Sequence, residues 1–147
     1  MQERFKNFTR LMNSIGRSIY RIKSEAMAEF DLKSSHVTCI YFLHRGFART
    51  ASDLCEVCEE DKANISRALK ELEERGLITR ELTAKGRPKR NITLTKEGHA
   101  IGDFLSKRVA NILEIVGEGV DEGERDIMYR ILSLIDKRLE HVCNEYC

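Results

Sequence analysis

Apolar residues recur along most of the chain at steps of three and four, the spacing of one face of an α-helix. The pattern predicts a first helix from Glu3 to about Phe30 and a second from Ser34 or Ser35 to His44, which Gly46 ends. The apolar stripe of the first helix is long enough to extend to a partner chain. It consists of Phe5, Phe8, Met12, Ile15, Ile19 and Ile22.

Two capping patterns predict the next pair of helices. The run Thr50–Asp53 has the spacing of a capping box, with Asp in place of the usual Glu, and begins a short helix that reaches about Glu59. Asp61 caps a longer helix, Lys62–Arg75, which Gly76 ends in the left-handed conformation. Its buried stripe is Ile65, Leu69 and Leu72.

The period then changes to the alternation of β-strands. Strands are predicted at Leu77–Leu82 and Asn91–Leu94, and Gly86 and Pro88 make Thr83–Arg90 between them a turn region. This segment is therefore a β-hairpin with a basic tip.

Two long helices complete the chain. Thr95 caps the first, which reaches about Gly117. The pair Asp121 and Glu124 caps the second, which ends near Cys143. The second helix carries a long apolar stripe like that of the first helix of the chain.

Two short helices followed by a β-hairpin is the order of a winged helix-turn-helix. The predicted fold class is therefore mainly α with a small β-hairpin wing. The whole chain, 1–147, has the size of one ordinary domain. We expect a winged helix-turn-helix lobe at 34–95 and dimerisation helices at 1–33 and 96–147.

Charge is distributed unevenly, although the formal net charge is only +1. The segment 62–90 holds nine Lys or Arg residues and four Glu residues, and the rest of the chain holds 16 basic and 20 acidic residues. One short region is basic while the remainder is acidic. That asymmetry favours a local phosphate-binding surface.

Several classes of protein are disfavoured by the same sequence. No stretch approaches the roughly 18 consecutive apolar residues of a membrane helix, and residues 1–6 lack the apolar run of a signal peptide. We therefore expect a cytoplasmic protein without a membrane partner. Without a Gly-rich phosphate loop, a nucleophile elbow or a convincing carboxylate pair, we expect no enzymatic activity and no cofactor.

The polar face of the Lys62–Arg75 helix suits DNA, because the major groove accepts one helix. Arg67 can bind a guanine edge and Asn64 an adenine edge, while lysines contact phosphates. The basic hairpin tip can reach an adjacent minor groove. The candidate DNA-binding residues are Thr50, Ser52, Lys62, Asn64, Ser66, Arg67, Lys70, Lys85, Arg87, Lys89 and Arg90.

Two runs of the chain resemble the MarR family of bacterial and archaeal regulators. Asp61–Ile78 is similar to that family's recognition helix and first wing strand, and Leu94–Gly98 to the segment that follows its wing. The resemblance implies a homodimer joined by its first and last helices. It also implies a regulator, more often a repressor, that binds a pseudo-palindromic operator in double-stranded DNA and is released by a small-molecule effector or by oxidation.

The wing departs from the family's pattern, which carries an Asp-x-Arg motif before the second strand. Counting back from Leu94, Gly86 takes the Asp position and Pro88 the Arg position, while Arg87 lies one residue early. A minor-groove contact would then come from Arg87 or Lys89 in a different register.

An effector pocket in this family lies between the dimer helices and the DNA-binding lobe. Here such a pocket would include His36, Cys39, Tyr41 and His44. The alternative for these four residues is ordinary packing and helix-end charge.

The cysteines allow a redox or metal switch through Cys55, Cys58, Cys143 or Cys147. Cys55 and Cys58 share one face of a helix, so core packing is the alternative. Acidic neighbours, such as Glu59 and Glu60, are expected to disfavour a thiolate there. A further alternative is a winged-helix module that binds a protein and never binds DNA, against which the basic wing argues.

Overall fold

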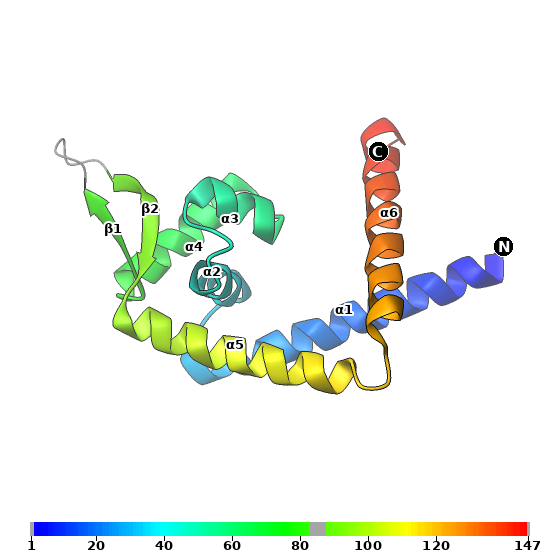
Figure 1. Cartoon of the computed structure of the whole chain (residues 1–147). Helices are drawn as coiled ribbons and strands as arrows, with labels where there is room; N and C mark the ends of the chain where they lie inside the picture. Colours follow the sequence, from blue (N-terminus) through cyan, green and yellow to red (C-terminus); the bar gives the residue numbers. More distant parts are fainter. Residues whose placement is uncertain (1, 83–87, 147) are drawn as a thin grey trace. The chain divides into compact units, whose positions relative to one another are not determined.

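The computed structural model describes residues 2–82 and 88–146, and six helices and two strands form in these ranges (Figure 1). The predicted fold class is confirmed, since the fold is mainly helical with one antiparallel hairpin. The chain divides into two compact units, Met1–Arg108 and Val109–Cys147. The elements are α1 (Gln2–Phe30), α2 (Ser34–His44), α3 (Ala51–Cys58), α4 (Lys62–Glu74), β1 (Ile78–Leu82), β2 (Pro88–Leu94), α5 (Lys96–Val116) and α6 (Glu122–Tyr146).

The core of the first unit forms where α2, α3 and α4 pack beside the hairpin. The stripe predicted for α4, Ile65, Leu69 and Leu72, is almost completely buried, with at most 1% of each residue exposed. Burying an aliphatic side chain of this size stabilises a fold by about 2 kcal/mol. This burial fixes which face of α4 points inward and leaves the opposite face in solvent.

The predicted caps are confirmed in detail. The hydroxyl of Thr50 accepts from the Asp53 amide at 3.1 Å, and the Asp53 carboxylate accepts in return from the Thr50 amide at 2.9 Å. The Asp61 side chain accepts from the Asn64 amide at 2.8 Å. These bonds satisfy amides that have no partner inside the helix, and so they set the starts of α3 and α4.

The hairpin is longer than predicted, because β2 begins at Pro88 and not at Asn91. The predicted turn region, Thr83–Arg90, therefore overlaps the strand. A proline at the first position of a strand removes no hydrogen bond from the ladder, so Pro88 can begin β2 although the sequence prediction places it in the turn. Ile78 pairs with Leu94, and the Ile92 amide donates to the Arg49 carbonyl at 2.8 Å, which ties β2 to the start of α3.

The junction between the hairpin and α5 depends on a close backbone contact. The Thr95 amide donates to the Leu77 carbonyl at 3.0 Å, and the Thr95 hydroxyl accepts from the Gly98 amide at 3.1 Å. A Cβ added at Gly98 would lie 2.1 Å from the Leu77 carbonyl oxygen. Only glycine fits here without displacing the backbone.

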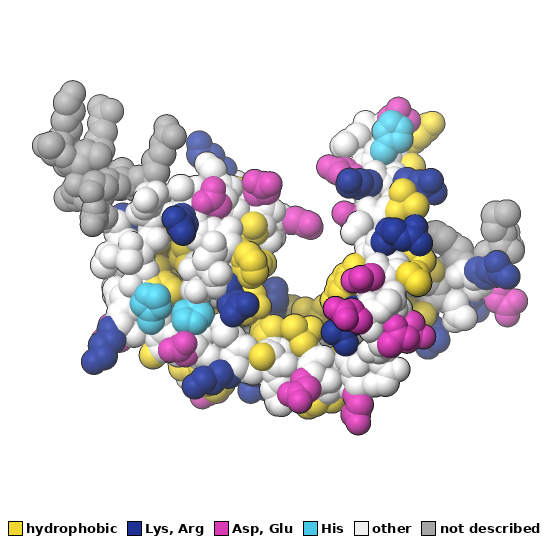
Figure 2. Space-filling model, viewed as in Figure 1, with side chains coloured by type: hydrophobic (Ala, Val, Ile, Leu, Met, Phe, Trp, Pro, Cys, Tyr) yellow, Lys and Arg dark blue, Asp and Glu magenta, His cyan; other side chains and the backbone are white. Residues whose placement is uncertain are grey.

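In the second unit, Asp121 and Glu124 form the predicted capping pair, and α6 continues to Tyr146, past the predicted end. None of the side chains described in α6 is buried. Figure 2 shows hydrophobic side chains on its surface. The large exposed ones are Ile127, Met128, Tyr129, Ile131, Leu134, Leu139, Val142 and Tyr146.

Among the described residues, no helix combines the length and the apolar run that a membrane crossing requires. The division into a lobe at 34–95 and flanking dimerisation helices stays a prediction, because the compact units divide within α5 instead.

Candidate nucleic-acid interface

The solvent face of α4 carries the polar residues that the sequence assigned to DNA. Lys62, Ser66, Arg67 and Lys70 are exposed, and Asn64 is half-buried. Lys62, Ser66 and Lys70 follow one another at steps of four, so they form one row along the helix. The row lies beside the buried stripe and is exposed along its length, and Arg67 lies more directly opposite that stripe.

Asn64 and Arg67 are already bonded to each other. The Arg67 guanidinium donates to Oδ1 of Asn64, and Nε of Arg67 donates to the Ala63 carbonyl at 3.3 Å. Nδ2 of Asn64 donates at 3.0 Å both to Glu60 and to Asp61. Both predicted base-contacting groups must therefore exchange these bonds for bonds to a base. The exchange is inexpensive, because polar contacts at an exposed surface contribute little.

The start of α3 lies beside a surface hollow of about 490 Å³ lined by Thr50, Ala51, Ser52 and Asp53. Ser52 is exposed, and the Thr50 hydroxyl accepts a bond from the Asp53 amide. Bonds to the Asp53 carboxylate from the Arg49 amide, the Thr50 hydroxyl and the Thr50 amide hold the pKa of Asp53 below its usual range. Asp53 therefore stays ionised, and the DNA contacts predicted for Thr50 and Ser52 stay a prediction.

The structure describes only part of the wing that the sequence predicts to bind DNA. Lys85 and Arg87 lie outside the described residues, and for Lys89 and Arg90 the backbone lies in β2 while their side chains are not described. Arg80 is a structural cation, since its Nε donates to Glu73 Oε2 at 3.1 Å. This bond fixes the base of the wing to α4.

The C-terminal half of α4 anchors the helix to the preceding segment. Arg75 donates to the carbonyls of Phe30, at 2.9 Å, and Asp31 at the end of α1. Glu71 accepts from Lys33, with 2.6 Å between Nζ and Oε2. The sequence prediction missed these anchors because the partners lie far apart in the chain.

His36 completes the same cluster and is almost fully buried, with 2% exposed. Its Nδ1 accepts from the Lys33 amide at 3.3 Å, and its Nε2 lies 3.1 Å from Glu71 Oε2. The second approach is an ion-pair distance without the direction of a hydrogen bond, so Nε2 has no hydrogen-bond partner among the described residues. Burial lowers the pKa of His36, and the Glu71 carboxylate opposes that effect.

The four residues predicted to form an effector pocket have different neighbours. His36 lines a cavity of about 490 Å³ that also reaches Asn64 and Arg67. Tyr41 packs edge-on against Phe42, with ring centroids 5.5 Å apart. His44 Nε2 lies 3.3 Å from Asp103 Oδ1, and Cys39 is completely buried in the core.

The described cysteines lie in α2, α3 and α6. Cys55 and Cys58 are both half-buried in α3. The neighbouring Cys39 thiol lowers the pKa of Cys58, while burial and the acidic neighbour Glu60 raise it, as expected for an acidic residue close to a thiol. Cys143 is exposed in α6, and Cys147 lies outside the described residues. Within the described ranges, no three His, Cys, Asp or Glu side chains are arranged to hold a metal ion.

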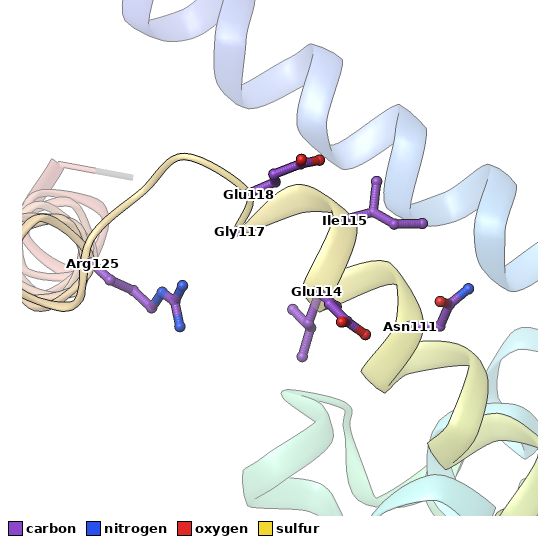
Figure 3. Close-up of a pocket in the computed structure, with 7 residues that line it drawn as sticks. Asn111, Glu114, Ile115, Gly117, Glu118 and Arg125 are labelled. Carbon is purple, nitrogen blue, oxygen red and sulfur yellow. The ribbon is translucent and has the colours of Figure 1, made fainter.

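The second unit has its own hollow of about 830 Å³, where α5 ends and α6 begins (Figure 3). Arg125 of α6 points toward Gly117, and Glu114 and Glu118 lie on the α5 side. The wall also includes Leu113 and Ile115, which are more than half exposed. Apolar side chains thus reach solvent in α5 as well as in α6.

Residues 30–87 match the model of the MarR family. This range covers α2, α3, α4 and β1, so the match covers the segment that carries the candidate interface. No curated protein sequence matches the chain closely enough to count as a relative.

Solved structures share the fold. The Staphylococcus aureus regulator MepR, in a complex with DNA, is 20% identical with a TM-score of 0.72, and the match covers 90% of this chain and 96% of that chain. A MarR family regulator from Neisseria meningitidis is 21% identical with a TM-score of 0.72, over 92% and 97%. One from Silicibacter pomeroyi is 22% identical with a TM-score of 0.68, over 90% and 87%.

The fold, the family match and a local backbone contact all concern the segment that carries the candidate interface. The helix-turn-helix and hairpin have the arrangement of these solved structures over nearly their whole length. The family match falls on the same segment. In the run Leu94–Gly98, after the wing, the close contact of Gly98 with the Leu77 carbonyl explains why a glycine stands at this position. Residues 30–87 thus carry the match to the MarR family model, and the chain has the fold of solved MarR family regulators.

Proposed function

We propose that the chain acts as a homodimeric repressor that binds a pseudo-palindromic operator through the N-terminal half of α4. The observation that carries the proposal is the exposed row Lys62, Ser66 and Lys70 together with Arg67, on the part of α4 that its buried stripe leaves in solvent. Two lysines and an arginine on one groove-sized face combine phosphate contacts with a group that can bind guanine. The similar structure of MepR with DNA supports this use of the fold.

The proposal includes a dimer because apolar side chains lie uncovered on the terminal helices. Leu11, Ile15 and Ile19 of α1 are about half exposed, and so are Ile127 and Leu139 of α6. Stable monomers rarely leave so many large apolar side chains in solvent. We assign 1–33 and 96–147 to dimerisation and 34–95 to DNA binding, so that two copies of α4 meet half-sites about one helical turn apart.

The proposal also includes relief by a small effector. Among the residues first considered, His36 has the most suitable position, because its cavity also reaches Asn64 and Arg67. A ligand in this cavity would compete for the side chains that we assign to base contacts. A bound effector would then lower the affinity for DNA, and bound DNA would lower the affinity for the effector by the same factor.

The decisive experiment selects bound fragments from random DNA with the purified chain and then measures affinity for the selected site by fluorescence anisotropy. We expect a palindromic site, and we expect Arg67→Ala to weaken binding by about tenfold or more, the worth of one bidentate base contact. Arg45→Ala, which removes an exposed arginine after α2 that is not among the candidate DNA-binding residues, is the matched control and should leave affinity unchanged. Retention of full affinity and sequence preference by Arg67→Ala would exclude α4 as the recognition helix.

A further inference from the structure

The end of α1 is bonded to the side chain of the residue that follows α4. The Arg75 guanidinium donates to the carbonyl of Phe30 at 2.9 Å and also to the carbonyl of Asp31. These carbonyls lie at the end of α1, where helix carbonyls have no partner inside the helix. The donor and its acceptors are 44 and 45 residues apart in the chain, so the contact joins two separate elements.

The backbone holds Arg75 in place at the end of α4. Its amide donates to the Glu71 carbonyl at 3.0 Å, and Gly76, which follows, adopts a φ of 69° that stops the helix. The Leu77 amide then donates to the Leu72 carbonyl at 2.9 Å, and β1 begins at the next residue. Arg75 therefore lies where α4 meets the hairpin.

The acceptors at the end of α1 are held in place by the core. The Phe30 ring packs edge-on against Phe104 of α5, with ring centroids 5.1 Å apart, and Leu32 is buried. Asp31, between Phe30 and Leu32, has a φ of 50°, in the left-handed region. Because the side chains on both sides of Asp31 pack inward, the two carbonyls present a fixed pair of acceptors to Arg75.

Arg75 is the direct polar contact between α1 and α4. Among the described residues, α1 packs against α2 and α2 packs against α4, whereas α1 and α4 share little packing. The ion pair of Lys33 with Glu71 joins α4 to the start of α2 and not to α1. A planar guanidinium that donates to two acceptors restrains direction as well as distance. Arg75 is therefore placed to orient α4 relative to α1.

We propose that Arg75 is a positioning residue that sets the separation of the two α4 helices in the dimer and so restricts the chain to operators of one half-site spacing. This role rests on the proposed function, in which α1 joins two copies and the N-terminal half of α4 meets each half-site. In a two-fold dimer, a shift of α4 along the DNA axis occurs in both copies and is doubled between them. A shift of about 1.7 Å in each copy changes the separation by one base pair, since adjacent pairs are about 3.4 Å apart along DNA.

The contact can position α4 although it adds little to stability. Arg75 is exposed, and polar contacts at an exposed surface contribute little to the free energy of unfolding. Replacing Arg75 should therefore leave the chain folded and change mainly the orientation of α4. Arg75 also lies about 12 Å along the helix from Arg67, by the rise of an α-helix. A loss of spacing preference is therefore separable from the loss of a base contact.

Operators with altered spacing test the proposal. Two inverted copies of the half-site selected by the wild-type chain are placed at the selected spacing and at spacings longer or shorter by one base pair, and fluorescence anisotropy measures the affinity. The wild type should bind the altered spacings about tenfold more weakly, the cost of one mismatched base pair. Arg75→Ala should bind all three spacings within about threefold of one another, less than the cost of one mismatch. Its preference for bases within each half-site should not change.

Two further variants separate the planar contact from the charge. Arg45→Ala, which removes an exposed arginine after α2, should keep the spacing preference of the wild type. Arg75→Lys keeps the positive charge but loses the planar pair of donors, so it should lose the spacing preference as Arg75→Ala does. Circular dichroism checks that each variant is folded.

Full spacing preference in Arg75→Ala or in Arg75→Lys overturns the positioning role. An equal loss of affinity at every spacing, with the spacing preference intact, assigns Arg75 to a phosphate contact and overturns it as well. Both results leave the proposed function standing. If the wild-type chain binds one half-site as tightly as two, the dimeric operator of the proposed function fails, and the role of Arg75 fails with it.

Discussion

Nε2 of His36 in α2 lies 3.1 Å from Oε2 of Glu71 in α4. The imidazole is buried and the carboxylate is partly exposed, so a surface charge on α4 is coupled to the interior of the first unit. Lys33 binds the same carboxylate from the residue that precedes α2. Glu71 therefore joins the start of one helix to the middle of another.

Replacing Glu71 tests this joint. We expect Glu71→Ala to lower the urea midpoint by a small but measurable amount, because the contacts of this carboxylate with Lys33 and His36 are lost. Glu74→Ala is the matched control, since Glu74 contacts Lys70 at 3.7 Å on the exposed face. Urea unfolding followed by circular dichroism measures both. Equal effects of the two variants would contradict a special role for Glu71.

His36 predicts how stability changes with mild acid. Its pKa in the folded chain lies below the usual value of 6.5, so the unfolded chain binds more protons as the pH falls past that value. The contribution is fully present above pH 6.5 and is lost as the pH falls toward the folded pKa. Asp53 and Glu71 have lowered pKa values as well, and their contributions are lost only below about pH 4.5.

The measurement is the urea midpoint at pH values from 7.5 to 5.0. The wild type should lose stability across this range, and His36→Gln should lose less. His99→Gln, which changes an exposed histidine, is the control. If His36→Gln and the wild type keep the same pH slope, protonation of another group causes the acid effect.

The close contact at Gly98, after the wing, predicts that adding a single methyl group there lowers the stability of the fold strongly. Gly98→Ala would place Cβ 2.1 Å from the Leu77 carbonyl oxygen, so the strand or α5 must move. We expect a loss of about 3 kcal/mol, the upper end for overpacking. Gly16→Ala adds the same methyl group where nothing lies within 4 Å, and should raise helix stability instead. Thermal unfolding compares the two, and a harmless Gly98→Ala would refute the close contact.

Much of the fold could be predicted because its determinants are local. The caps at Thr50 and Asp61 join residues three apart, and the buried stripe of α4 follows helical spacing. The start of β2 is not predicted by the sequence, because a proline fits a turn as well as the first position of a strand.

The predicted site was less complete than the predicted fold, for the same physical reason. The candidate face of α4 depends on its own periodicity and was available from the sequence. The bonds of Arg75 to the end of α1 depend on how separate helices pack, which spacing along the chain does not encode. Asn64 and Arg67 are three residues apart on one helix and are therefore neighbours, so their bond is predictable from the sequence.

Salt dependence separates the roles assigned to the cations of α4. Lys62 is exposed at the first residue of the helix, where we assign it a phosphate. Lys62→Ala should weaken binding to every DNA sequence alike and reduce the slope of log affinity against log salt by about 1. Arg67→Ala should instead relax the preference at one base position, because a guanine contact carries sequence information and a phosphate contact does not. Fluorescence anisotropy between 50 and 200 mM salt, on the selected site and on a scrambled site, distinguishes the phosphate contact from the base contact. If both variants lose the same affinity on both DNAs, Arg67 contacts the phosphate backbone of DNA and not a base.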